Sequence, residues 1–136
     1  KFEAGTPPIA EVIGLSSSLN FINEIGIDNI YSFESELTEY AYEQMKKINN
    51  IKLYGDFKNQ TSIISFNIDG IHFNDLAMFL DKKNIAIRTG HHCAQPFMKH
   101  FDITGNARMS VGVYNTKEDV DYFVRSIDEI KSILLS

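Results

Sequence analysis

Apolar residues recur with a helical period in three long stretches of the chain. In residues 8–25 and 28–48 they return every three or four positions, which predicts two consecutive helices, each with an apolar stripe. The second stretch carries glutamates early and lysines late, the order that the helix dipole favours. A third long helix is predicted after Thr116, which can cap it together with Asp119, three positions later.

Shorter segments alternate between apolar and polar positions, as half-buried strands do. They are residues 51–54, 64–68, 85–88 and 107–113. A short helix is predicted over residues 74–83, with Asn84 as its left-handed end. Residues 89–106 are predicted to be irregular or weakly helical. This order of elements favours the α+β or α/β class, with a small sheet covered on one side by long helices.

The composition is that of an ordinary globular chain. Of 136 residues, 43% are apolar and 23% are charged, and no window reaches the roughly eighteen apolar residues of a membrane span. The length fits one domain or a piece of one. The net charge of −5 repels phosphate backbones and anionic membranes, so we expect neither nucleic acid nor a membrane as partner. The first residues include no initiator methionine and no leader pattern, so we expect a stretch from within a longer protein.

Cys93 is the single cysteine of the chain and cannot form an internal disulfide, which predicts a reducing compartment, the cytoplasm or an organelle. A lone cysteine is often an inert core residue. Residues 88–96, however, surround this one with an arginine, two histidines, a glycine and a proline. That composition is typical of a loop, and cationic neighbours favour the reactive thiolate. Both roles stay open at this point.

Arginine is scarce in this chain, which has ten lysines but three arginines. Two of the arginines, Arg88 and Arg108, bracket Cys93 in sequence. A guanidinium group binds a carboxylate through two parallel hydrogen bonds, which an ammonium group cannot do. Arg108 lies on the face of its predicted strand opposite Met109, where it could grip an amino-acid carboxylate. The alternative is an ion pair with one of the eighteen acidic residues.

Two further sequence patterns contain residue types that occur in binding sites. Metal-ligating residue types gather in one segment, at positions His91, His92, Cys93 and His100. Their spacing matches no common zinc motif, so we predict no metal site, and a Cys–His hydrolase is a minor alternative because no orienting third group is evident. Gly5 and Thr6 precede a proline-started helix, where backbone N–H groups and a hydroxyl can meet a phosphate.

Four segments, in order along the chain, resemble the C-terminal part of type II cysteine desulfurases of the SufS kind. They are residues 1–7 (Lys-Phe-Glu-Ala-Gly-Thr-Pro), residues 88–96 (Arg-Thr-Gly-His-His-Cys-Ala-Gln-Pro), Arg108 with Ser110, and residues 114–116 (Tyr-Asn-Thr). The second segment is the most specific, because type I desulfurases such as IscS and NifS carry their cysteine in a different, longer loop. The resemblance implies an aminotransferase-like fold of type I that uses pyridoxal phosphate.

In that family the chain would be the C-terminal small domain over residues 1–136, with a three- to four-stranded, mostly antiparallel sheet. Residues 1–7 would be a remnant of the segment leading out of the cofactor-binding large domain. The resemblance implies that Cys93 attacks the sulfur of L-cysteine, leaving alanine and a persulfide. It also implies that Arg108 and Arg88 line the substrate pocket. Gly5 and Thr6 would contact the cofactor phosphate across a homodimer interface.

The family passes its persulfide sulfur to SufE-like or SufU-like acceptors for iron–sulfur cluster assembly. Members that work with SufU tend to have a histidine just before Asp75, whereas this chain has Asn74, so we expect a SufE-like acceptor. The family's Ser-Gly-His-Lys segment, whose lysine forms the Schiff base, does not occur in this sequence. The chain alone is therefore expected to be inactive. The alternatives are a stand-alone persulfide carrier or interaction module without the cofactor, and a selenocysteine lyase on the same fold.

Overall fold

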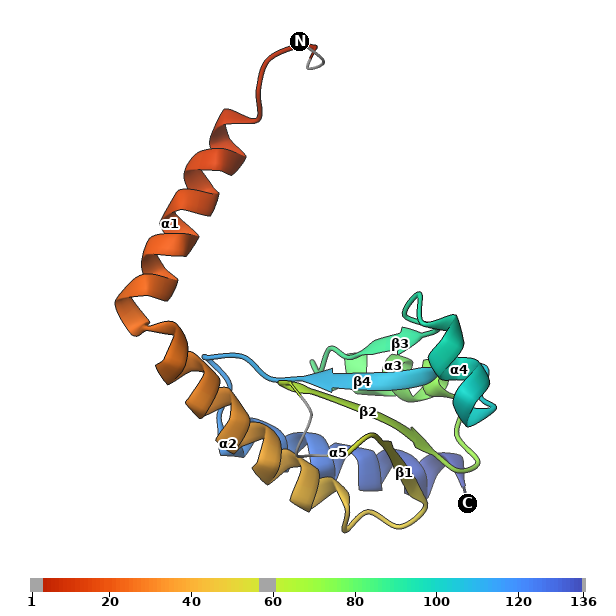
Figure 1. Ribbon diagram of the computed structural model, residues 1–136. Coiled ribbons are helices and arrows are strands. Elements are labelled where there is room, and N and C mark those ends of the chain that lie inside the picture. The colour runs from red at the N-terminus through yellow and green to blue at the C-terminus, as the bar shows by residue number, and fades with distance from the viewer. Residues whose placement is uncertain (1–3, 57–60, 136) are drawn as a thin grey trace. The chain divides into compact units, whose positions relative to one another are not determined.

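The computed structural model describes residues 4–56 and 61–135. The chain divides into two units, residues 1–33 and residues 34–136. The first unit contains helix α1 (Ile9–Ile25) and the start of α2 (Ile27–Met45). The second contains the rest of α2 and every strand that the structure describes (Figure 1). No helix within the described residues is both long and apolar enough to cross a membrane.

Helix α1 confirms the helix predicted over residues 8–25. Pro8 stands at its N-cap, and Gly26 ends it with a φ of 89°, donating its N–H to the carbonyl oxygen of Ile22. A residue with a Cβ would be strained at that φ, so glycine suits this junction between α1 and α2. None of the side chains of α1 is buried by the described residues.

The second unit contains a sheet of four antiparallel strands, which confirms the predicted small antiparallel sheet, and the strands lie in the order β1-β2-β4-β3. The strands are β1 (Ile51–Tyr54), β2 (Ile63–Ile68), β3 (Arg88–Gly90) and β4 (Asn106–Ser110). In the register, Ile64 opposes Met109 and Ser65 opposes Arg108. Because successive side chains point to opposite faces, Ile64 and Met109 share one face while Ser65 and Arg108 share the other.

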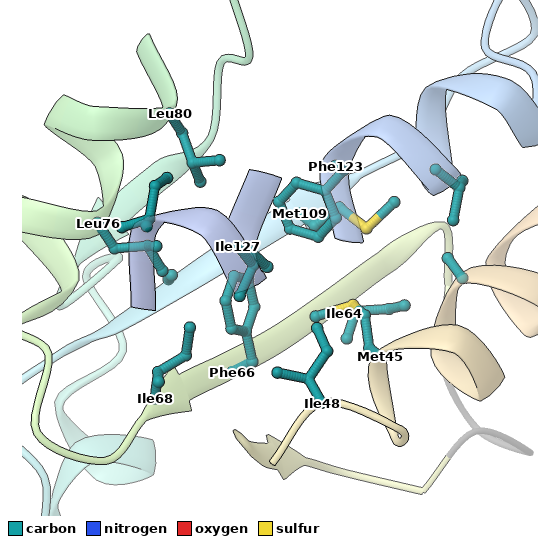
Figure 2. Packing of buried hydrophobic residues seen from close by; sticks show 14 of the residues in the cluster. Met45, Ile48, Ile64, Phe66, Ile68, Leu76, Leu80, Met109, Phe123 and Ile127 are labelled. Atoms are coloured by element: carbon teal, nitrogen blue, oxygen red, sulfur yellow. The ribbon is translucent and has the colours of Figure 1, made fainter. Parts of the chain in front are cut away.

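One face of the sheet carries the hydrophobic core. Three helices cover it, namely α2 from Glu34 onwards, α3 (Phe73–Asp81) and α5 (Lys117–Leu134) (Figure 1). Figure 2 shows the side chains that fill the space between helices and strands, among them Met45, Ile64, Phe66, Leu76, Leu80, Phe123 and Ile127. The rings of Phe66 and Phe123 meet edge to face, 6.0 Å apart. The predicted one-sided covering by helices is confirmed.

The ends of the helices follow the local sequence. Thr116 and Asp119 form the predicted capping box at the start of α5, each side chain accepting from the other residue's backbone N–H. Asn84 adopts the predicted left-handed conformation just beyond α3, with a φ of 60°. The segment predicted to be irregular or weakly helical holds one short helix, α4 (Gln95–Phe101).

The third strand differs from its prediction over residues 85–88, because strand pairing covers residues 88–90. Ile85 donates its N–H to Leu80 at the end of α3, and Arg88 is the first residue opposite β4. Residues 84–87 are not paired with β4, and they line a cavity of about 530 Å³ together with residues 109–112 and several residues between 114 and 123. The alternation of Ile85 and Ile87 therefore reflects packing against the core, where both are partly buried.

The opposite face of the sheet is covered at one end by α4. Tyr54 of β1 contacts the rings of Phe97 and Phe101 from that helix, with centroid distances of 5.8 Å and 5.0 Å. This small aromatic cluster anchors α4. It also fixes the end of the loop that joins β3 to α4, which contains Cys93.

Candidate functional site

Arg88 and Arg108 are direct partners across the strand pair β3–β4. Residues opposite each other in an antiparallel pair project from the same face, with Cβ atoms about 5 Å apart. That face is the one opposite the core, because Ala107 and Met109, on either side of Arg108, are both buried in the core. The structure thus brings together the two arginines that are twenty positions apart in the sequence.

The two guanidinium groups have no acidic partner among the residues that the structure describes. The ion pairs found there involve Lys46, Lys83 and Lys131. The Nε atom of Arg108 is buried and has no hydrogen-bond partner within the same residues. Like charges directly opposite each other are unfavourable, and an anion between them removes the conflict. This arrangement suits a carboxylate or phosphate, and it argues against the alternative of an ion pair with an internal acid.

Cys93 lies on the loop that leaves this strand pair. Gly90, the last residue of β3, is opposite Asn106 and has a φ of 114°. The loop then turns through a hydrogen bond from Ala94 N–H to the carbonyl oxygen of His91, 2.9 Å long. Cys93 is a free thiol and is exposed, so the alternative of an inert core cysteine is wrong. An exposed thiol is accessible to a small substrate.

The two adjacent histidines differ in their surroundings. His91 is exposed, whereas His92 is partly buried and its Nε2 lies 3.0 Å from the carbonyl oxygen of Asn106. The pKa of His92 is lowered, chiefly because burial disfavours the imidazolium, and the charges of Arg108 and Arg88 add to the effect. Among the described residues, no three His, Cys, Asp or Glu side chains are grouped so that they could hold a metal ion.

Asn74 is hydrogen-bonded to strand β3. It lies in the first turn of α3, and its Oδ1 accepts a hydrogen bond of 2.9 Å from the hydroxyl of Thr89, in β3. Asn74 is exposed, and Thr89 follows Arg88 directly. Asn74 is therefore hydrogen-bonded to the strand that leads to the Cys93 loop. The expectation of a SufE-like sulfur acceptor depends on this residue.

Asn106 was not singled out from the sequence, yet its side chain is fully buried at the start of β4. Neither its amide nitrogen nor its amide oxygen has a partner among the described residues, and its carbonyl oxygen meets His92. No sequence spacing links positions 92 and 106, because the contact arises from strand pairing. The one available signal was a polar residue at the start of an alternating segment.

Gly5 and Thr6 belong to the first unit and are exposed. Gly5 has a φ of 92°, and a Cβ placed on it would have no atom within 4 Å. The helix that follows has no side-chain cap at its N-terminus, because Pro8 occupies the N-cap position. An exposed glycine and a hydroxyl just before a helix start suit a phosphate group.

Comparison with known proteins gives a consistent picture. Residues 1–123 match the family model described as aminotransferase class-V. The chain is 46% identical over 132 residues to a probable cysteine desulfurase of Staphylococcus aureus (strain COL), covering 96% of this chain and 32% of that protein. Among solved structures it is similar to the apo cysteine desulfurase of Thermococcus onnurineus NA1, with a TM-score of 0.87 and 38% identity over 95% of this chain and 32% of that one.

The cysteine desulfurase CsdA of Escherichia coli, in an S-sulfonic acid form, is also similar, with a TM-score of 0.87 and 35% identity. That match covers 97% of this chain and 33% of CsdA. The chain thus spans about a third of the length of these relatives.

Proposed function

The chain belongs to the class-V aminotransferase family, and from this we propose that it is part of a cysteine desulfurase that depends on pyridoxal phosphate. In this proposal residues 1–136 form the C-terminal small domain, and residues 1–7 lead out of the cofactor-binding large domain. The observation that carries the proposal is the exposed Cys93 on the loop that leaves the Arg88–Arg108 strand pair. The cysteine desulfurases among its relatives support the same activity.

Arg108 and Arg88 would bind the carboxylate of L-cysteine. Arg108 suits the closer contact, because its Nε is buried and lacks a partner among the described residues. Its guanidinium can offer two parallel hydrogen bonds to the carboxylate oxygens. Arg88, directly opposite and more exposed, adds charge at the mouth of the same site. The carboxylate would also neutralise the repulsion between the two side chains.

Cys93 would then act on the sulfur of the bound cysteine. Its Sγ forms a bond with the substrate sulfur while the Cβ–S bond of the substrate breaks. The electron pair of the broken bond stays with Cβ, which takes up a proton to give alanine. Cys93 retains the sulfur as a persulfide, and the step involves no external oxidant or reductant. When bound, pyridoxal phosphate supplies an electron sink for the charge that develops on the substrate carbons.

Gly5 and Thr6 would hold the cofactor phosphate across a homodimer interface, which fits their open backbone and hydroxyl ahead of α1. No Ser-Gly-His-Lys segment occurs in the sequence, so the Schiff-base lysine would come from the remainder of the longer polypeptide. For that reason the 136-residue chain alone is expected not to release alanine.

The persulfide sulfur would pass to a SufE-like acceptor, less favourably to a SufU-like one, for iron–sulfur cluster assembly. The support for this choice is Asn74 in place of histidine, hydrogen-bonded to Thr89 of β3. A reducing compartment, the cytoplasm or an organelle, is part of the same proposal because a persulfide relay needs reduced thiols.

The test uses the full-length polypeptide loaded with cofactor, carrying Cys93→Ala. We expect alanine formation from cysteine to fall by about 10³-fold or more, because no other thiol of this chain can accept the sulfur. The cofactor absorbance should stay unchanged, which controls for folding and loading. Near-normal alanine release by Cys93→Ala would overturn the proposal. A colourless full-length protein would favour the stand-alone carrier, and a preference for selenocysteine over cysteine would favour the lyase.

A further inference from the structure

The backbone around Cys93 is held in an unusual conformation. His92 and Cys93 are consecutive residues with φ values of 54° and 55°, in the left-handed region. Side chains with a Cβ disfavour that region, and two such residues in succession are rarer still. The surrounding structure must therefore hold the loop in place. The hydrogen bond from Ala94 to His91 closes the turn, but it does not tie the turn to the sheet.

The side chain of His92 provides that tie. A carbonyl oxygen can only accept, so the 3.0 Å contact with Asn106 requires that Nε2 carries the proton and donates it. The Nδ1 atom on the other side of the ring is buried and has no partner among the described residues. The ring is thus directed inward from the loop, whereas the next residue, Cys93, is exposed. Burial lowers the pKa of His92, the hydrogen bond to Asn106 opposes it and the two arginines add to the lowering, so the balance favours the neutral ring.

The carbonyl oxygen that accepts this hydrogen bond belongs to the strand that also carries Arg108. Asn106 begins β4, opposite Gly90 of β3, and lies two residues before Arg108 on the same strand. Residues two apart on a strand project from the same face. One hydrogen bond therefore links the loop that carries the thiol to the strand that carries the carboxylate-binding arginine.

We infer that His92 is a positioning residue whose Nε2–H bond to the Asn106 carbonyl fixes the Cys93 loop relative to Arg108. It does not touch the substrate. It sets the distance between the nucleophile and the carboxylate clamp, and displacements of about 1 Å in such a distance can lower a rate by about 10²-fold. This inference rests on the proposed function, in which Cys93 is the nucleophile and Arg108 binds the substrate.

The experiment compares His92→Gln with His92→Met in the full-length, cofactor-loaded protein. The two replacements have the same length and both carry a Cβ, but only glutamine can donate an N–H to the Asn106 carbonyl. Histidine at position 100 is exposed, so His100→Met serves as the matched control. We expect His92→Met to lower kcat by about 10- to 100-fold with KM for cysteine nearly unchanged, because Arg108 is untouched. His92→Gln should recover most of the rate, and His100→Met should leave it unchanged.

Hydrogen exchange of residues 91–94 gives a second readout that requires no turnover. We expect faster exchange in His92→Met than in His92→Gln, because the loop loses its tie to β4. Equal kcat and equal exchange in the two variants would overturn the role of His92. A Cys93→Ala protein that still forms alanine would overturn the proposed function instead, so the two failures are distinguishable. If His92→Met does not fold while His92→Gln does, the bond supports the whole domain, and the specific role in positioning is overturned.

Discussion

One face of the sheet is covered by α2, α3 and α5, whereas the other carries Arg88, Arg108 and the start of the Cys93 loop. On the covered face the side chains of Ile64, Phe66 and Ala107 are 0–1% exposed. On the other face, polar atoms of Arg108, Asn106 and His92 are buried without a partner among the described residues. The same strands build both faces, since consecutive residues of a strand point in opposite directions.

Because the two faces differ in this way, residues that stabilise the fold and residues that face the site alternate along the same strand. Ala107 and Met109 belong to the core, while Arg108 between them faces the site. Facing like charges, unpartnered polar atoms and two left-handed residues are all unfavourable for folding. They persist because the apolar contacts on the covered face stabilise the strands that carry them. A substitution on one face should therefore affect stability, and its neighbour on the other face should affect function.

Ile64→Ala and Ile63→Ala test that separation most strongly. The two isoleucines are neighbours in β2, but Ile64 is 1% exposed in the core and Ile63 is 39% exposed on the other face. Removing the Ile64 side chain should lower the free energy of unfolding by about 2–5 kcal/mol, through lost burial and the cavity left behind. The same change at Ile63 should cost less than about 1 kcal/mol. Denaturant unfolding followed by circular dichroism measures both values.

Similar losses for the two variants would contradict the comparison, because they would mean that the site face is as well packed as the core. A larger loss of unfolding free energy for Ile63→Ala than for Ile64→Ala would mean that the site face contributes more to stability than the core face. A change in the denaturant slope of either variant would indicate an altered unfolded state and not an altered core.

The fold was largely accessible from the sequence because its elements are long or strongly patterned. The helical period over residues 8–25 and the capping box at Thr116 each depend on neighbouring residues, and local physics decides them. The strand predicted over residues 85–88 was wrong because its alternation has another cause. Ile85 and Ile87 pack against the core, while pairing with β4 begins at Arg88. An alternating pattern of apolar residues indicates which side chains are buried, but a buried side chain need not belong to a residue that is paired with another strand.

The site was only partly accessible. The composition around Cys93 predicted a loop and left its role open, and the structure shows that the thiol is exposed on that loop. The facing arrangement of Arg88 and Arg108 depends on the register of two strands, which a single sequence does not specify. The contact between His92 and Asn106 is also a product of that register. Sequence reasoning therefore found the residue types and missed how they are held.

Arg108→Lys should weaken substrate binding and leave the free energy of unfolding nearly unchanged, whereas Ile64→Ala should mainly lower the free energy of unfolding. A lysine keeps the charge but cannot form the two parallel hydrogen bonds to a carboxylate. We expect KM for cysteine in the full-length enzyme to rise by about 10- to 100-fold, the range that a charge-assisted bond implies. The free energy of unfolding should change by less than about 0.5 kcal/mol. Arg125→Lys, the same change at an exposed position of α5, is the control and should leave KM unchanged. An unchanged KM in Arg108→Lys would remove this residue from the substrate site.

The smallest expected effect is a dependence of stability on pH that arises from His92. Its pKa in the folded protein lies below the ordinary histidine value, first because of burial and then because of Arg108 and Arg88. The folded state therefore binds fewer protons here than the unfolded state, so the stabilisation is complete above the unfolded pKa and is lost as pH falls through the folded one. Between about pH 7 and pH 5, the wild type should lose more unfolding free energy than His92→Gln, which cannot titrate. Every other titratable group is common to both proteins, so the difference isolates position 92. Equal losses of unfolding free energy in the wild type and in His92→Gln would contradict this prediction, because they would mean that folding does not lower the pKa of His92.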